Sequence, residues 1–215
     1  MKKNQTTLIF DWDDTLFATA RFIKEIKRSF RQLGVTEEVF FAAYHSCRDE
    51  NGCWSPRCLA GELKRIIPGL TEKRVLAQLN SCLLGTKKFV YPEVAAVLKR
   101  LARRRIKIIL ISFGPKKFQA AKIKYSGLAK FFDKIIFDCV DLAKIEKISR
   151  VFNAASRQGS VYFVEDKGSG VEAVKIANPS INSVWIKRPN GRYLNQQCQA
   201  DFIIRNLRDL EKIIK

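Results

Sequence analysis

The first apolar segment of the sequence ends abruptly in carboxylates, and this junction constrains the fold more than any other feature. Thr6–Asp11 is short and rich in β-branched and aromatic residues, which is typical of a strand buried on both faces of a parallel sheet. Because alternate residues of an extended segment point the same way, Asp11 and Asp13 should share one face at the carboxyl end of this strand. Ligands bind at that end of an open α/β sheet, so we expect the functional site to begin there.

Similar apolar segments alternate with helical patterns along most of the chain. Further strands are predicted at Lys107–Ser112, Lys134–Phe137, Ser160–Glu165, Ser183–Lys187 and Ala200–Ile204. Helices are predicted at Pro92–Arg104, Lys116–Tyr125, Lys144–Arg157, Ser169–Ala177 and Asn206–Ile214. Strands that alternate with helices of about ten residues favour an α/β fold with a doubly wound, mostly parallel, Rossmann-like sheet.

The stretch after the first strand breaks this alternation. It shows no convincing strand, and glycines and a Pro-Gly pair separate apolar patterns of helical period. Four helices are predicted, at Thr19–Leu33, Thr36–Ser46, Pro56–Ile67 and Thr71–Leu84. We therefore expect a core formed by residues 1–18 and 87–215, with residues 19–86 as a small helical insertion.

The cysteines form no familiar pattern. They are Cys47, Cys53, Cys58, Cys82, Cys139 and Cys198, and no two are spaced as a C-x-x-C pair. Because the N-terminus lacks a secretory signal, reduced thiols are expected rather than a disulfide framework. His45 lies near three of these cysteines in the sequence, which leaves a zinc site as the alternative.

Charge and hydropathy bear on location and partners. No apolar segment approaches the ~20 residues that a membrane-spanning helix needs, and the first segment reaches Asp11 before an apolar signal core could form. We predict a cytoplasmic protein, with export by a route that uses no N-terminal signal left open.

The formal net charge of +19, concentrated between Lys87 and Lys134, predicts acidic or phosphate-rich partners, with a merely solvated basic surface as the alternative.

The aspartates after the first strand predict a cation. Two carboxylates this close repel each other unless a cation or a shared proton offsets them. Mg²⁺ suits the pair because it prefers oxygen ligands and substrate phosphate. The alternative is that these residues cap a helix starting near Thr15, which explains one aspartate but not three.

The segment LIFDWDDTLF resembles the first motif of the haloacid dehalogenase-like (HAD) superfamily, an Asp-x-Asp-x-Thr that ends the first strand. The strand ending in Ser112 is similar to the second motif, in which Ser or Thr hydrogen-bonds a phosphoryl oxygen. The strand ending in Glu165 and Asp166 is similar to the fourth, in which Asp166 would complete a magnesium site. The resemblance makes the predicted core a HAD-like catalytic core and the insertion a C1-type cap.

The third motif is a lysine that heads the helix before the last of these strands. We assign it to Lys147, with Lys144 as the alternative. The sequence departs from the commonest pattern at one position, because Gly170 stands four residues after Asp166 where a second aspartate is usual. Glu165 or water would then have to compensate in the metal site.

The resemblance implies a magnesium-dependent phosphomonoester hydrolase. Asp11 would attack phosphorus and form an aspartyl-phosphate, while Asp13 would protonate the leaving oxygen and then activate water. Asp11, Asp13 and Asp166 would hold the Mg²⁺ ion, and Ser112 and Lys147 would bind the phosphate. Members that act on haloacids lack the second aspartate, so Asp13 favours phosphoryl transfer.

The substrate is less constrained. A C1 cap usually admits small phosphorylated molecules, whereas the basic surface favours an acidic or macromolecular substrate. The late motifs partly resemble a magnesium-dependent phosphatase branch that includes phosphotyrosine-protein phosphatases, and a phosphotyrosine protein is the specific hypothesis. The alternatives are a small-metabolite or nucleotide phosphatase, a phosphotransferase, and a catalytically weak module that binds nucleic acid or an anionic membrane through its basic face.

Overall fold

Six parallel strands form the centre of the molecule. The computed structural model describes residues 5–214, apart from the side chains of residues 141 and 142. The strands are β1 (Thr7–Phe10), β2 (Lys107–Phe113), β3 (Lys134–Asp138), β4 (Val161–Glu165), β5 (Asn182–Ile186) and β6 (Phe202–Ile204). Their order is β3-β2-β1-β4-β5-β6, and every pairing is parallel. The predicted α/β class and all six predicted strands are confirmed.

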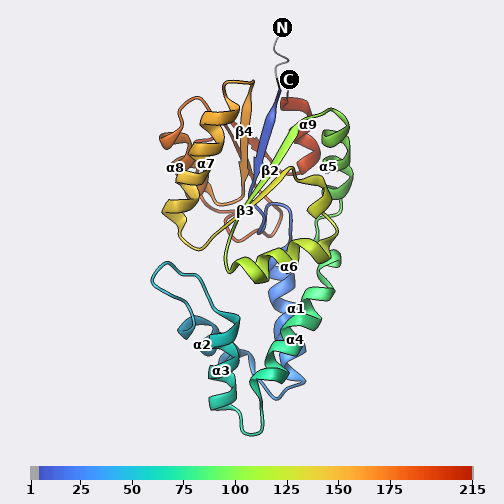
Figure 1. Cartoon of the computed structure of the whole chain (residues 1–215), viewed down its shortest axis with the longest axis vertical. Helices are drawn as coiled ribbons and strands as arrows, with labels where there is room; N and C mark the ends of the chain where they lie inside the picture. The colour runs from blue at the N-terminus through green and yellow to red at the C-terminus, as the bar shows by residue number, and fades with distance from the viewer. Residues whose placement is uncertain (1–4, 215) are drawn as a thin grey trace.

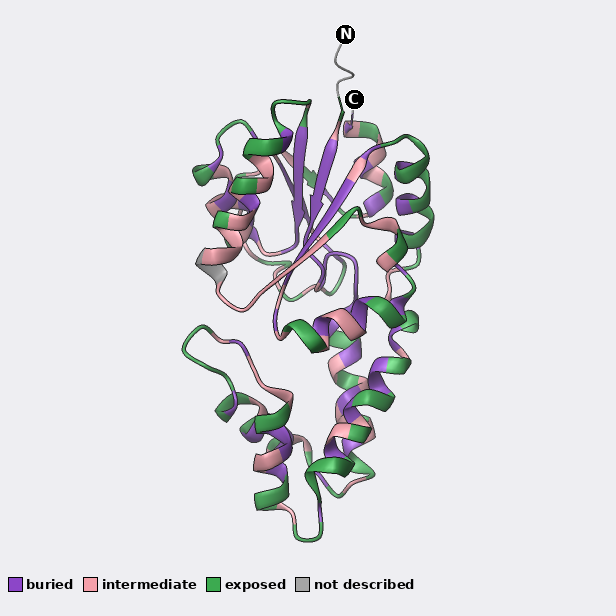
Figure 2. Cartoon of the chain, viewed as in Figure 1, coloured by how far each residue is buried: buried purple, intermediate pink, exposed green. Residues whose placement is uncertain are grey.

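Helices cover both faces of the sheet (Figure 1). They are α5 (Val94–Arg103), α6 (Lys116–Ser126), α7 (Asp141–Ala155), α8 (Gly168–Ala177) and α9 (Leu210–Ile213), with short 3-10 helices η1 (Thr86–Phe89), η2 (Ala129–Phe131) and η3 (Leu207–Asp209). On one face, Leu8 and Phe10 pack in the same apolar cluster as Leu98 of α5. On the other, Ile9 packs with Ile148 of α7. The alternation along β1 therefore buries the strand from both sides, as Figure 2 shows.

The insertion after β1 is helical, as predicted. It contains α1 (Thr19–Arg31), α2 (Glu37–Ser46), α3 (Pro56–Ile66) and α4 (Glu72–Leu84), which lie beyond one end of the sheet (Figure 1). The hydroxyls of Thr36, Ser55 and Thr71 each accept a backbone N–H in the first turn of α2, α3 and α4. These caps satisfy backbone donors that would otherwise lack a partner, which explains where the helices begin. Whether the insertion and the core are separate domains stays a prediction.

The chain enters and leaves the insertion through two segments that hydrogen-bond to each other. The backbone N–H of Ala18 donates to the carbonyl of Phe89 at 2.8 Å, and that of Tyr91 donates to the carbonyl of Leu16 at 3.2 Å. The insertion is thus joined to the sheet by a paired connection at the carboxyl end of β1.

Two disulfides correct the expectation of reduced thiols. Cys47 pairs with Cys58 inside the insertion, and Cys53 pairs with Cys139 in the loop after β3. The second bridge ties the loop between α2 and α3 to the core. The suggested zinc site near His45 is not formed, because two of its thiols bond each other and the third bonds Cys139. No helix in the described part of the chain is both long and apolar enough to cross a bilayer.

Candidate active site

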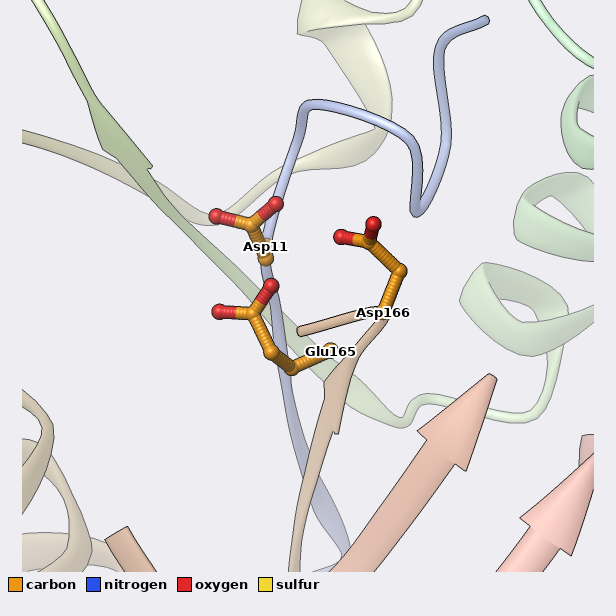
Figure 3. A group of neighbouring side chains, drawn as sticks. All are labelled: Asp11, Glu165 and Asp166. Atoms are coloured by element: carbon orange, nitrogen blue, oxygen red, sulfur yellow. The ribbon is translucent and has the colours of Figure 1, made fainter. Parts of the chain in front are cut away.

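Three carboxylates meet at the carboxyl ends of neighbouring strands. Asp11 directly follows β1, Glu165 ends β4, and Asp166 is the next residue. All three are buried, and one oxygen of each lies within 4.8 Å of the others. Figure 3 shows the three side chains turned toward a common space. Parallel pairing of β1 with β4 produces this cluster, because it places both strand ends at the same edge.

Lys144, not Lys147, joins the cluster. The Lys144 Nζ lies 2.7 Å from Oδ1 of Asp11 and 2.7 Å from Oε2 of Glu165. The Lys147 Nζ instead lies 2.6 Å from Oδ2 of Asp138, at the end of β3. The structure therefore places the alternative lysine, Lys144, beside Asp11, and Lys147 beside Asp138. The two residues lie three apart on α7 and so share one side of the helix, but Lys144, nearly one turn closer to the N-terminus, is the one that contacts Asp11.

The cluster carries more negative charge than Lys144 offsets. Burial and the neighbouring Glu165 raise the pKa of Asp11 to about 7, although Lys144 opposes the shift. Burial, Glu165 and Asp11 raise the pKa of Asp166 to about 10. Burial opposes the charge of Lys144, yet its two carboxylate partners hold its pKa well above the usual range. The excess charge is what a bound cation would relieve.

A divalent ion fits this donor set. The Oδ2 atom of Asp166 is buried without a hydrogen-bond partner, while its Oδ1 accepts a hydrogen bond from the Thr15 hydroxyl at 3.3 Å. Carboxylate oxygens are the ligands that Mg²⁺ prefers. Of the residues the structure describes, Asp11, Glu165 and Asp166 are the one group of three or more acidic, His or Cys side chains close enough to share an ion. Asp13, which we predicted as a ligand, is not in this group.

Glu165 is the nearest side chain to position 170, where the sequence has glycine in place of an aspartate. A Cβ built on Gly170 would lie 3.5 Å from Oε2 of Glu165. Position 170 thus faces the cluster, and Glu165 supplies a carboxylate where the commoner family pattern has an aspartate. This geometry is consistent with the hypothesis that Glu165 compensates in the metal site for the absent aspartate at position 170.

Asp13 lies beside the cluster and is held by donors from two helices. Its Oδ1 accepts from Nζ of Lys122 at 2.5 Å and from the hydroxyl of Thr19 at 2.5 Å, and its Oδ2 accepts from Nε2 of Gln119 at 2.8 Å. Burial alone would raise the pKa of Asp13, but Lys122 and these hydrogen bonds hold it below the usual range. The structure therefore keeps Asp13 as an anion.

The end of β2 carries one buried hydroxyl without a partner, and the next two residues, Phe113 and Gly114, line the cavity described below. Ser112 is buried, and its Oγ has no hydrogen-bond partner. Gly114 has φ of +130°, where an L residue is strained, and an added Cβ would meet Nε2 of Gln119 at 3.0 Å. This glycine therefore lets the chain turn closely past the cavity before α6 begins.

Sequence reasoning missed three groups at the site. Gln119 and Lys122 project from α6 to Asp13, and Arg192 donates to Oδ2 of Asp14 from the loop after β5. Burial opposes the charge of Arg192, but Asp14 raises the pKa of the guanidinium. Only weak features of the sequence point to these residues as part of the site. Gln119 and Lys122 are in the helix right after the second motif, and Arg192 follows an Asn-Gly turn.

A cavity of about 300 Å³ lies against these residues. The core side supplies Asp11, Asp13, Phe113, Gly114, Phe118, Gln119, Lys122, Lys144, Glu165, Asp166, Lys167, Arg192 and Tyr193. The insertion supplies Thr19, Phe22, Ile23, Ile26, Phe40, Phe41, Tyr44, Arg48, Asn51, Gly52, Trp54 and Leu79. Most charged side chains of the lining therefore come from the core, and the insertion contributes mainly apolar and aromatic ones. The arrangement can hold an anion at Asp11 and a less polar group beneath the insertion.

Comparisons with known proteins agree with the fold. The family model described as haloacid dehalogenase-like hydrolase matches residues 5–178. A search of curated proteins gave no match. Among solved structures, a haloacid dehalogenase-like hydrolase from Burkholderia xenovorans has a TM-score of 0.78 at 20% identity, covering 99% of this chain and 100% of that one.

Other similar structures differ in the activity their descriptions state. A protein described as a phosphatase from Clostridium difficile has a TM-score of 0.63 at 17% identity, with complete coverage of both chains. The L-2-haloacid dehalogenase from Xanthobacter autotrophicus has a TM-score of 0.60 at 18% identity, covering 98% of each chain. Identities this low establish the fold alone.

Proposed function

The chain belongs to the haloacid dehalogenase-like hydrolases, and from this premise we propose that it is a magnesium-dependent phosphomonoester hydrolase. The observation that carries the proposal is the position of Asp11. Its carboxylate borders the cavity, its Oδ1 contacts the Lys144 ammonium, and Asp13 follows two residues later. A nucleophilic carboxylate, a cation beside it and a second carboxylate form a set suited to phosphoryl transfer.

Asp11 would attack phosphorus in line, displace the leaving oxygen and form an aspartyl-phosphate. Asp13 would give a proton to the leaving oxygen and, in the second step, take one from the water that hydrolyses the intermediate. Lys122 holds Asp13 as an anion before substrate binds. The charge of an arriving phosphate raises the proton affinity of Asp13, so we expect it to gain the proton on binding.

Lys144 and Ser112 would bind the phosphoryl oxygens. The Lys144 ammonium already contacts Asp11, and the unpartnered hydroxyl of Ser112 is available to donate. Asp11, Glu165 and Asp166 would hold Mg²⁺, which when bound neutralises charge that develops on the phosphoryl group. This assignment replaces Asp13 with Glu165 and Lys147 with Lys144.

A haloacid dehalogenase is the second candidate, because the similar structures include such enzymes. Asp13 is the residue that argues against it, since members acting on haloacids lack this aspartate. We expect an acidic substrate, either a phosphotyrosine protein or a small metabolite or nucleotide. A separate hypothesis is that the basic surface contacts nucleic acid or an anionic membrane.

The test compares two products from the same protein. Phosphate release from p-nitrophenyl phosphate and halide release from 2-chloropropionate are measured with Mg²⁺ and with EDTA, for the natural sequence and for Asp11→Asn. Asp209→Asn, at the surface beside Lys212, is the matched control. We expect magnesium-dependent phosphate release that Asp11→Asn abolishes and Asp209→Asn leaves unchanged. Halide release without phosphate release would favour the dehalogenase. Neither product from folded protein would favour a binding module.

A further inference from the structure

From the aromatic wall of the cavity we infer that the substrate is a small phosphomonoester whose alcohol carries an aromatic ring. This inference rests on the proposed function and names the substrate class for the same site. It concerns the part of the substrate that leaves, whereas the carboxylates and Lys144 act on the phosphoryl group.

Aromatic rings from the insertion and the core meet at this wall. The ring centroids of Tyr44 and Trp54 lie 5.3 Å apart, and Trp54 meets Phe118 of α6 edge-to-face at 4.9 Å. Phe118 also lies 6.4 Å from Phe22 of α1. These distances are in the range in which aromatic rings attract one another, so a further ring can join the group with the same geometry.

The same wall has more apolar than polar surface, and its hydrogen-bonding groups are those of Tyr44, Trp54, Asn51 and Arg48. Its neighbours along α1, Phe22, Ile23 and Ile26, have no polar side-chain atom. Arg48 is the cation of the insertion at the cavity, but its Nε donates to the carbonyl of Gly52 at 2.9 Å. Hydroxyls buried against Phe22, Ile23 and Ile26 would lose hydrogen bonds with water without regaining them. This part of the wall therefore favours an aromatic or apolar group over a hydroxylated one.

The space accommodates a ring beside the phosphoryl group. The cavity holds about 300 Å³ and is partly open to solvent. The contact of Trp54 with Phe118 and the disulfide of Cys53 with Cys139 both join the insertion to the core beside this cavity. These contacts hold the insertion against the core, so we assign the site to a free small molecule rather than to a phosphorylated protein.

The experiment matches the chemical reactivity of the substrates and varies only the ring. Benzyl phosphate, cyclohexylmethyl phosphate and ribose 5-phosphate all release a primary alcohol, so differences in kcat/KM report recognition. A phosphotyrosyl peptide is the fourth substrate. We expect kcat/KM for benzyl phosphate to exceed that for ribose 5-phosphate by about tenfold or more, and that for cyclohexylmethyl phosphate to fall between them.

Variants test whether the named wall is responsible. Phe118→Leu keeps an apolar side chain but removes the ring, and Phe131→Leu makes the same change in η2, outside the cavity lining. Phe118→Leu should lower kcat/KM for benzyl phosphate about five- to tenfold while changing that for ribose 5-phosphate less than about twofold. Phe131→Leu should leave the ratio of the two unchanged.

The outcomes separate this inference from the proposed function. If ribose 5-phosphate or the peptide is hydrolysed as well as benzyl phosphate, the substrate class is wrong and the phosphatase stands. If no ester is hydrolysed, the proposed function fails. The inference is then tested by calorimetry, which measures the affinity of Asp11→Asn with Mg²⁺ for benzyl phosphate and for ribose 5-phosphate. Higher affinity for benzyl phosphate supports the inference, and equal or lower affinity overturns it.

Discussion

The ammonium of Lys144 lies 2.7 Å from the carboxylate of Asp11. This contact joins residues 133 positions apart in the sequence and depends on where α7 lies relative to β1. It orients the carboxylate at the cavity and places a positive charge where an attacking oxygen and a phosphoryl oxygen would meet. Such a charge stabilises the transition state of phosphoryl transfer more than the bound substrate.

Replacing Lys144 should therefore impair catalysis, whereas the same replacement three residues later should not. Lys144→Met is expected to lower kcat for phosphate release about 10²–10³-fold, since it removes one donor to the reacting group. Lys147→Met is the matched control on the same helix, because removing the Lys147 ammonium breaks a contact with Asp138 and none with Asp11. A comparable fall in kcat for both variants, with both folded, would contradict the assignment.

The stability of the protein in EDTA should fall as pH rises. The pKa of Asp11 is raised from 3.8 to about 7 in the folded state, so above pH 4 the folded state holds a proton that the unfolded chain has released. This contribution is complete below about pH 4 and is lost as pH rises through 7; it is on the order of 4 kcal/mol. Asp166, with its pKa raised to about 10, extends the decline to higher pH.

Chemical unfolding between pH 5 and pH 9 measures this effect. Asp11→Asn should flatten the part of the decline below pH 7. Added Mg²⁺ should raise the midpoint of thermal unfolding more at pH 8 than at pH 5, because the ion binds the ionised carboxylates. Stability that rises with pH in EDTA would show that the cluster does not carry excess negative charge.

A carboxylate at position 170 should strengthen metal binding. Gly170 lies in the first turn of α8 and faces Glu165, so Gly170→Asp adds a charge to the cluster without requiring an unusual backbone. We expect Mg²⁺ affinity to rise about tenfold by calorimetry, with lower stability in EDTA. Gly170→Asn has nearly the same shape and no charge, and equal affinities for the two variants would mean that position 170 does not reach the ion.

The two disulfides should contribute unequally to stability. Cys53 and Cys139 are separated by 86 positions and Cys47 and Cys58 by 11. In the chain-entropy model, the longer loop stabilises by about 4–5 kcal/mol and the shorter by about 3 kcal/mol. Replacing each pair by serines and measuring urea unfolding compares them. A larger loss from the Cys47 and Cys58 pair would reverse the expected order.

Local patterns were enough to predict the elements of the fold. The apolar run before Asp11 predicted a central strand, and β1 pairs with β2 and β4 on its two sides. Helix ends were also predictable, because Thr36, Ser55 and Thr71 are side chains that cap within their own turn. These features depend on residues close together in the sequence, which is why they can be recognised there.

The sequence by itself determined the order of strands and helices, the helical insertion and the presence of Asp11, Asp13, Ser112 and Asp166 at strand ends. Only the tertiary structure placed Lys144 rather than Lys147 beside Asp11, brought Lys122 to Asp13, and paired cysteines expected to be free. The physical reason is that these contacts depend on the rotation and placement of whole helices and loops. Distant packing sets both, whereas hydrophobic period and capping act within a few residues.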